Sequence, residues 1–277
     1  MADFTILFIG DVVGKPGRRM VRRGVAALRA RRTIDFVIVN GENAAGGSGI
    51  TVQTARELLA AGADCLTSGD HVFKQREGET VLKAEPRVLR PMNLSDLAAG
   101  RGWNVYTSAA GVPVAVMNLQ GRTFMRPVDN PFHAVEKALQ ALGEAAKVIV
   151  IDFHAEATSE KIALGRMLDG RVSAVLGTHT HVPTADEHIL PGGTAYITDV
   201  GMTGPYDSVL GRRVDRVIAH LVTDMPFRFD VATGDCRLCG AIVTVDPDTG
   251  RASAIERVTV REDELPPEKG PASEGPE

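Results

Sequence analysis

Two histidines stand two residues apart in the stretch VLGTHTHVP, residues 175–183, directly after an apolar run. An imidazole can bind a divalent metal through a ring nitrogen, or it can simply form a hydrogen bond on a loop. His179 and His181 on their own leave both possibilities open. The choice depends on whether the rest of the chain brings compatible ligands to the same place.

The elements that would position such ligands follow a β-α-β pattern, in which short Val- and Ile-rich runs alternate with helical stretches. The expected strands here cover residues 4–10, 36–41, 64–69, 112–119, 147–153, 172–177 and 194–201. The expected helices cover residues 17–32, 51–62, 78–85 and 131–143. From residue 227 the pattern changes to antiparallel strands at 227–232, 237–246 and 252–262. The sequence therefore predicts an α/β fold with a β-rich C-terminal segment.

Polar side chains recur at the ends of these expected strands. Ligands of open α/β sheets bind beyond the carboxyl ends of the strands, so such side chains are expected to converge at one edge. The set consists of Asp11, Glu42, Asn43, Asp70, His71, His154, His179 and His181. The remaining histidines, His133, His188 and His220, are interpreted as ordinary helix or loop residues.

The chemistry of this set indicates metal ions. Carboxylate, amide and imidazole groups without thiolate suit ions such as manganese, iron, zinc or magnesium. The candidates are too many for one ion, whereas two ions about 3.5–4 Å apart with a bridging carboxylate would suit a displacement at phosphorus. Each residue also has a structural alternative. Asp11 or Glu42 could cap a helix, Asn43 could hold a turn, and His154 could be a hydrogen-bonded core histidine.

Five motifs resemble, in this order, the metal-binding blocks of the calcineurin-like metallophosphoesterases: GDVVG, NGEN, SGDH, DFHAEATSEK and GTHTHVP. Residues 4–262 as a whole resemble the YmdB-type branch, for which NGENAAGGSGIT and DVGMTGPYDSVLG are distinctive. The resemblance implies a four-layer α/β sandwich, with residues 1–265 forming a single metallophosphoesterase domain. It also implies two divalent or trivalent ions per chain, with iron or manganese ahead of magnesium or zinc. The implied activity is phosphodiester hydrolysis, typically of cyclic nucleotides, by attack of a metal-bound hydroxide.

Carried onto this chain, the resemblance implies a role for each member of the set. One metal site would consist of Asp11, Glu42, Asn43 and His181. The second site would consist of Asp70, His154 and His179, with Glu42 as the bridge. His71 would not bind metal and would protonate the leaving group as a general acid. In the glycine-rich loop 201–211, Thr203 and Tyr206 are expected either to contact the substrate or to form the turn.

Two positions depart from the usual pattern of the superfamily. Val13 stands where the first block normally has His, which removes one imidazole from the first site. Asp70 stands where the third block normally has Asn. The added carboxylate is expected to favour a more highly charged ion and to make the attacking water less acidic.

Two other functions are weighed against hydrolysis. GDVVGKPGRR superficially resembles a phosphate-binding P-loop, but that motif needs a longer spacer before Gly-Lys and a hydroxyl residue where Pro16 stands. The second alternative is a non-catalytic regulatory protein that uses the metals to sense a nucleotide or to contact an RNA-processing partner. A complete ligand set with an unliganded His71 favours catalysis, because a pure binding protein has no need of a proton donor.

The composition limits the class of protein. The chain has 277 residues, of which 44% are hydrophobic and 24% charged, as expected for one globular domain. A net charge of −4 is not that of a dedicated nucleic-acid binder, and the arginine-rich stretch 17–32 is interpreted as a solvated helix face. No apolar stretch approaches the ~20 residues that span a bilayer, and residues 1–14 do not resemble a signal peptide, so we expect a cytoplasmic protein.

Three further expectations concern cysteines, tail and assembly. Three cysteines cannot form a disulfide framework, and the pair Cys236 and Cys239 is interpreted as reduced and structural. Residues 266–277 are rich in Pro, Gly and Glu, a composition typical of disorder. We expect a homo-oligomer, whose size the sequence does not specify.

Overall fold

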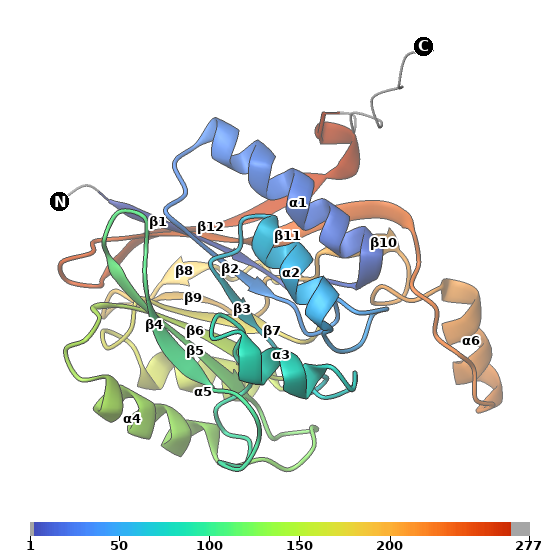
Figure 1. Ribbon diagram of the computed structural model, residues 1–277, viewed down its shortest axis with the longest axis horizontal. Coiled ribbons are helices and arrows are strands. Elements are labelled where there is room, and N and C mark those ends of the chain that lie inside the picture. The colour runs from blue at the N-terminus through green and yellow to red at the C-terminus, as the bar shows by residue number, and fades with distance from the viewer. Residues whose placement is uncertain (1–2, 267–277) are drawn as a thin grey trace.

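The computed structural model describes residues 3–266, which form a mixed α/β structure with two six-stranded sheets (Figure 1). In the first sheet, β1, β2 and β3 are parallel, and β11 runs antiparallel to β1, β10 and β12. The strands of this sheet are β10 (Gly204–Asp207), β11 (Gly234–Val245), β1 (Phe4–Ile9), β2 (Phe36–Asn40), β3 (Cys65–Thr67) and β12 (Ala252–Arg261).

The second sheet has a parallel centre and antiparallel edges. In spatial order it consists of β4 (Trp103–Thr107), β5 (Pro113–Gln120), β6 (Val148–His154), β7 (Ala174–Thr178), β9 (Ala195–Ile197) and β8 (His188–Ile189). Only β4 and β8, at the two edges, run against their neighbours. The central strands therefore end at a common edge, where their polar terminal residues can meet.

Helices pack on the outer faces of both sheets (Figure 1). The helices of the structure are α1 (Gly14–Arg31), α2 (Val52–Ala60), α3 (Gly78–Ala84), α4 (Pro131–Leu142), α5 (Thr158–Met167) and α6 (Val214–Thr223). Local sequence explains their ends: Thr51 caps α2 through the backbone N–H of Thr54, and Asn130 caps α4 just before a proline. α6 projects away from the two sheets.

Alternate strand residues face different apolar clusters. Ile6 and Phe8 of β1 pack between the sheets with Val148 of β6, whereas Leu7 lies in the cluster beneath α1 and α2. A third cluster joins the second sheet to α4 and α5. Both sheets are therefore apolar on both faces, as expected for strands covered from two sides.

Most predicted elements are confirmed, with two errors: one lies near the C-terminus, and the other is His188, which was expected on a helix or loop but begins the edge strand β8. Residues 227–232 were expected to form a strand, but only Val231 forms an isolated bridge, to Arg212. Backbone bonds from Arg213 to Asp230 and from Ala232 to Gly211 hold this segment on a loop, so it adds to no sheet. β4, β8, β10, α5 and α6 are additional to the predicted elements. Except for residue 266, the predicted disordered tail lies outside the described residues.

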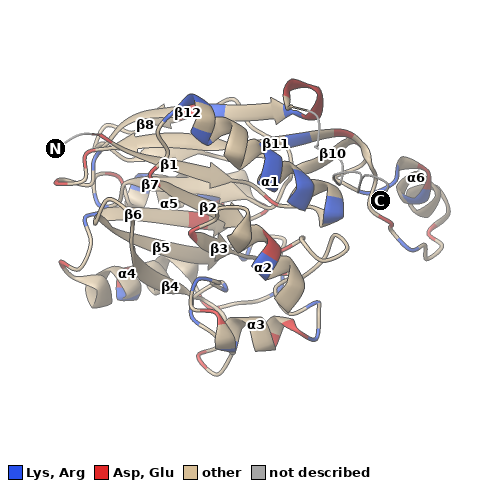
Figure 2. Ribbon diagram, turned by 45° about the horizontal axis from the view of Figure 1, so that its top comes forward, with Lys and Arg blue, Asp and Glu red and all other residues tan. Residues whose placement is uncertain are grey.

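The basic stretch on α1 is part of the folded surface (Figure 2). Its ion pairs include Arg18–Glu57, Arg19–Glu262, Arg23–Glu262, Arg29–Asp64 and Arg32–Glu256. Much of its charge is thus neutralised by acidic partners, in agreement with its interpretation as a solvated helix face. Within residues 3–266, no helix combines the length and apolar character needed to cross a bilayer. The three cysteines are buried and free.

Candidate metal centre

The structure brings the eight residues of the predicted metal and acid set to one edge of the paired sheets. Asp11 follows β1, Glu42 and Asn43 follow β2, and Asp70 and His71 follow β3 in the first sheet. From the second sheet, His154 ends β6, and His179 and His181 follow β7. Residues as distant in the sequence as Asp11 and His181 therefore share one site, because the parallel strands of both sheets end there.

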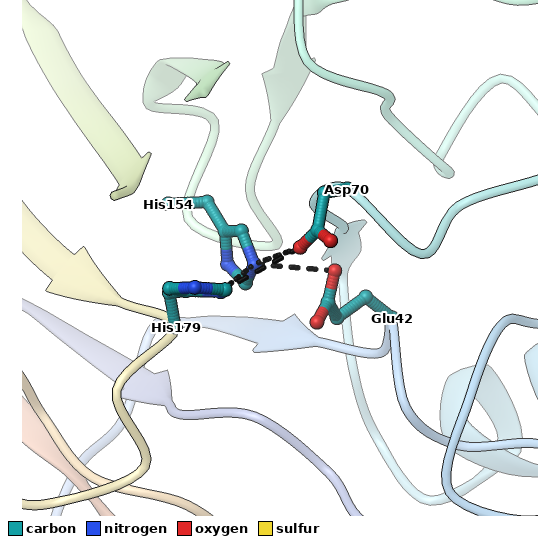
Figure 3. Close-up of side chains that lie close together, drawn as sticks. All are labelled: Glu42, Asp70, His154 and His179. Atoms are coloured by element: carbon teal, nitrogen blue, oxygen red, sulfur yellow. Dashed lines mark hydrogen bonds and ion pairs between the residues drawn. The ribbon is translucent and has the colours of Figure 1, made fainter. Parts of the chain in front are cut away.

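Four of these residues form a compact ligand group: Glu42, Asp70, His154 and His179 (Figure 3). One ligand atom from each lies within 4.8 Å of the other three. The Nε2 atom of His154 is 3.2 Å from both a Glu42 oxygen and an Asp70 oxygen, and 3.0 Å from Nδ1 of His179. Two carboxylates and two imidazole nitrogens that converge in this way form a donor set suited to a divalent cation.

Asp11 provides the observation that favours a second cation position. Its side chain is fully buried, and its Oδ1 atom has no hydrogen-bond partner within residues 3–266. This oxygen lies 3.8 Å from Nδ1 of His154 and 3.9 Å from Nε2 of His181, both too far for a hydrogen bond, while Oδ2 accepts a 3.0 Å bond from the backbone N–H of His179. Burial raises the pKa of Asp11. A buried carboxylate with an unpaired oxygen is costly unless a charge faces it, so the residues present fit a metal here.

Asn43 connects the two parts of the site. Its Nδ2 atom donates to Glu42 at 2.8 Å and lies 3.3 Å from Nε2 of His181. Its Oδ1 atom is 2.8 Å from Nδ1 of His71. An amide binds a metal through oxygen, so Asn43 would have to turn its amide over to become a ligand.

The outer nitrogen of each of the three metal-site imidazoles has its own partner. Nδ1 of His154 lies 2.9 Å from the hydroxyl of Thr178, and Nδ1 of His181 lies 3.2 Å from the carbonyl oxygen of Leu210. His179 presents Nδ1 to the cluster and places Nε2 3.2 Å from Glu156. Such outer contacts fix the ring orientation and tautomer of metal-binding histidines.

The charges of the site shift its proton equilibria. Burial by itself lowers the pKa of His154, but Glu42 and Asp70 outweigh burial and raise that pKa well above its usual value. Burial opposes ionisation of Glu42, yet His154 lowers the carboxyl pKa to about 2. Burial and the charge of His154 lower the pKa of His179 to about 4. The metal-free cluster therefore holds a proton on His154, among carboxylates that would otherwise face a cation.

His71 lies at the solvent side of the cluster, with 32% of its side chain exposed. Its Nδ1 atom contacts Asn43, and its Nε2 atom is 3.5 Å from Asp70. It is outside the compact ligand group and is partly open to solvent. A role as proton donor, predicted from the sequence, is compatible with this position.

Thr203 and Tyr206 are outside the compact ligand group, although the backbone N–H of Thr203 donates to the carbonyl oxygen of Asp11 at 2.8 Å. Thr203 is fully buried and its hydroxyl donates to the carbonyl oxygen of Cys239 at 3.2 Å. The hydroxyl of Tyr206 donates to the carbonyl oxygen of Met202 at 3.0 Å, and Arg237 lies over its ring. Both hydroxyl groups are used within the fold, and their contact with a substrate stays a prediction.

Several supporting residues were missed by the sequence analysis. Gly69 is one: a Cβ atom there would lie 2.2 Å from His154 and 2.3 Å from Glu42, so only glycine lets the backbone pack against both ligands. Glu156 is another, through its contact with His179. Their signal was present, because they stand inside the motifs SGDH and DFHAEATSEK. Four more supporting residues were also missed: Asp152, Thr178, Lys161 and Asp199.

The chain is similar over most of its length to known proteins. The chain is 48% identical over 260 residues to the 2′,3′-cyclic-nucleotide 2′-phosphodiesterase of Bacillus subtilis (strain 168), covering 94% of this chain and 98% of that protein. A crystal structure of a novel phosphatase from Mycoplasma pneumoniae superposes with a TM-score of 0.88 at 33% identity, over 94% of each chain. A hypothetical protein from Thermus thermophilus superposes with a TM-score of 0.87 at 41% identity, over 93% of this chain and 99% of that one. The model of the YmdB-like protein family matches residues 7–258, and the chain belongs to this family.

Proposed function

We propose that this chain is a metal-dependent phosphodiesterase built on the four-layer sandwich of the metallophosphoesterases. The observation that carries the proposal is the convergence of Glu42, Asp70, His154 and His179 beside the unpaired buried oxygen of Asp11. The 48% identity to a cyclic-nucleotide phosphodiesterase supports the same chemistry. A 2′,3′-cyclic nucleotide is accordingly the proposed substrate.

Two metal positions are proposed within the site, sharing Glu42. The compact group would hold one ion through Glu42, Asp70, His154 and His179. The remaining members, Asp11, Asn43 and His181, would hold the other together with Glu42. The mixture of carboxylate and imidazole donors suits iron or manganese, with magnesium or zinc as further candidates.

The reaction divides between the metals and the chain. Ions bound at these positions would polarise the phosphoryl oxygens and make the attacking water more acidic. His71 would give a proton to the departing ribose oxygen, which otherwise leaves as a strongly basic alkoxide. Oδ1 of Asn43 lies 2.8 Å from Nδ1 of His71. With the amide turned over for metal binding, Nδ2 would take the place of Oδ1, donate to Nδ1 and orient the ring so that Nε2 faces the substrate. Asp11 and Glu42 are buried, and their carboxylates would supply negative charge to the bound ions.

The proposal is tested by turnover of the metal-analysed full chain. The substrates are 2′,3′-cyclic AMP, 3′,5′-cyclic AMP, bis(4-nitrophenyl) phosphate and a phosphomonoester, each with manganese, iron, magnesium or zinc. Metal-dependent hydrolysis of the 2′,3′-cyclic nucleotide, abolished by a chelator, is expected. Absence of turnover with every metal would overturn the proposed enzymatic function. Nucleotide binding without turnover would favour the regulatory alternative.

A homo-oligomer, an RNA-related partner and a cytoplasmic location are further predictions. They are separate from the hydrolytic proposal, because each catalytic and metal-binding residue named above belongs to one chain. Light scattering during size-exclusion chromatography would test the first, and co-purification from nuclease-treated and untreated extracts would test the second.

A further inference from the structure

A buried ion pair lies behind the two histidines of the GTHTH stretch. Lys161 of α5 and Asp199, which follows β9, each expose only 1% of their side chains. The Nζ atom of Lys161 is 2.8 Å from Oδ2 of Asp199. Neither residue belongs to the proposed ligand set.

The pair holds the backbone on both sides of His179. Lys161 also donates to the carbonyl oxygen of Thr178 at 2.8 Å. Asp199 accepts from the backbone N–H of Thr180 at 3.1 Å and from its hydroxyl at 2.8 Å. The residue before His179 and the residue between the two histidines are thus fixed to one buried pair of charges.

These contacts act where the backbone is unusual. His179 has φ of 97° and His181 has φ of 66°, both in the left-handed region that side chains other than glycine avoid. Such a conformation persists only when surrounding contacts impose it. It is also the conformation that directs Nδ1 of His179 and Nε2 of His181 into the cluster.

We infer that Lys161 and Asp199 are positioning residues for His179 and His181, and that their ion pair sets the metal affinity of the site. The inference rests on the proposed metal-dependent function. Metal sites depend on such outer contacts, since loss of one typically weakens metal binding about 10–100-fold. A pair that served only the fold would affect thermal stability and leave metal affinity unchanged.

The test uses the double variant Lys161→Met/Asp199→Asn, because each single change leaves one buried charge unpaired and can prevent folding. Mn²⁺ is titrated calorimetrically into the metal-free full chain well below the unfolding temperature, and circular dichroism checks the fold. Lys147→Met, which removes the exposed pair with Glu144, is the matched control. We expect the Mn²⁺ affinity to be about 10–100-fold lower in the double variant and unchanged in the control. In the double variant kcat should fall, and KM should change less than kcat does.

The outcomes separate this inference from the proposed function. Failure of the wild-type chain to bind Mn²⁺ counts against the proposed function. A folded double variant with wild-type Mn²⁺ affinity and kcat overturns the positioning role. If the double variant does not fold, Thr180→Val removes only the hydroxyl bond to Asp199. Weakened Mn²⁺ binding in that variant then supports the inference, and unchanged binding overturns it.

Discussion

The Nδ1 atom of His154 lies 2.9 Å from the hydroxyl oxygen of Thr178, which donates a 2.7 Å hydrogen bond to Asp152. Because the hydroxyl proton of Thr178 points to the carboxylate, its oxygen accepts from Nδ1–H of His154. Nε2 of His154 then carries the lone pair that faces Glu42 and Asp70 whenever the ring is neutral. Asp152 thus sets the tautomer of His154, a proposed ligand, through the Thr178 hydroxyl.

Thr178→Val removes this acceptor while keeping the shape of the side chain. We expect Mn²⁺ affinity about 10–100-fold lower, because the ring of His154 is no longer held with Nε2 inward. Calorimetric titration of the metal-free chain measures it. Thr194→Val, which removes a buried threonine hydroxyl bonded to Val172 at 2.6 Å, is the control and should bind Mn²⁺ normally. Equal Mn²⁺ affinities in both variants would argue against the role of Thr178 in holding the His154 ring.

Glu42→Gln tests the proposed bridge. Glu42 contacts His154 through one oxygen and accepts from Asn43 through the other, so it can face both metal positions. The variant should lose at least one of two ions together with activity, while folding is retained because Glu42 lies at a strand end. Elemental analysis and circular dichroism check this, with the exposed Glu136→Gln as control. Two retained ions per chain would refute the bridge.

Asp70→Asn tests the unusual carboxylate of the third block. Asp70 lies 3.2 Å from His154 and 3.5 Å from His179. Neutralising it should make the attacking water more acidic, so the pH–rate profile should shift to lower pH and the metal preference should change. Profiles are recorded for each metal-reconstituted form, beside Asp215→Asn at an exposed site. An unchanged profile would mean that Asp70 does not act on the metals.

Metal binding should release a proton from His154. The pKa of His154 is raised in the folded protein, so protonation of His154 stabilises the metal-free fold fully at pH values below the usual histidine pKa of 6.5. This stabilisation is lost as the pH rises through the pKa that His154 has in the folded protein. A metal needs the neutral ring, so binding near neutral pH should release close to one proton from this residue. Mn²⁺ titrations in two buffers of different ionisation enthalpy measure it. Equal binding heats in both buffers would contradict the expectation.

The meeting of the candidate site residues was predictable because each stands at or near the end of an apolar strand. Parallel strands bring their ends together whatever their separation in the sequence, so Asp11 and His181 could be grouped without knowledge of the contacts. The positions of the strands followed from their Val- and Ile-rich runs. β4 was missed because WNVYT is short and mixes polar with apolar residues.

The supporting contacts were not predictable in the same way. Lys161 lies on a helix with a weak apolar stripe, and its partner Asp199 is 38 residues away in a loop. Local sequence favours an exposed lysine there, since a buried one is stable only beside a partner that the fold supplies. The role of Thr178 was equally unpredictable, because it ends an apolar run like that of any other central strand. Tertiary packing, and not local pattern, determines these roles.

His71→Ala separates acid catalysis from metal binding. A general acid contributes most when the leaving group is poor, typically about 10²–10⁴-fold, because the proton then stabilises a large charge in the transition state. A ribose hydroxyl is a poor leaving group, whereas nitrophenolate is already stable as an anion near neutral pH.

We therefore expect His71→Ala to reduce kcat/KM for a 2′,3′-cyclic nucleotide far more than for bis(4-nitrophenyl) phosphate, with metal content unchanged. The geometry supports this split, because Nε2 of His71 is 3.5 Å from Asp70 but outside the compact ligand group. The measurement is kcat/KM on both substrates with elemental analysis of each preparation. His133→Ala, on α4, is the control variant. Equal losses on both substrates, or loss of an ion, would show that His71 acts as a ligand or a positioning residue and not as the acid.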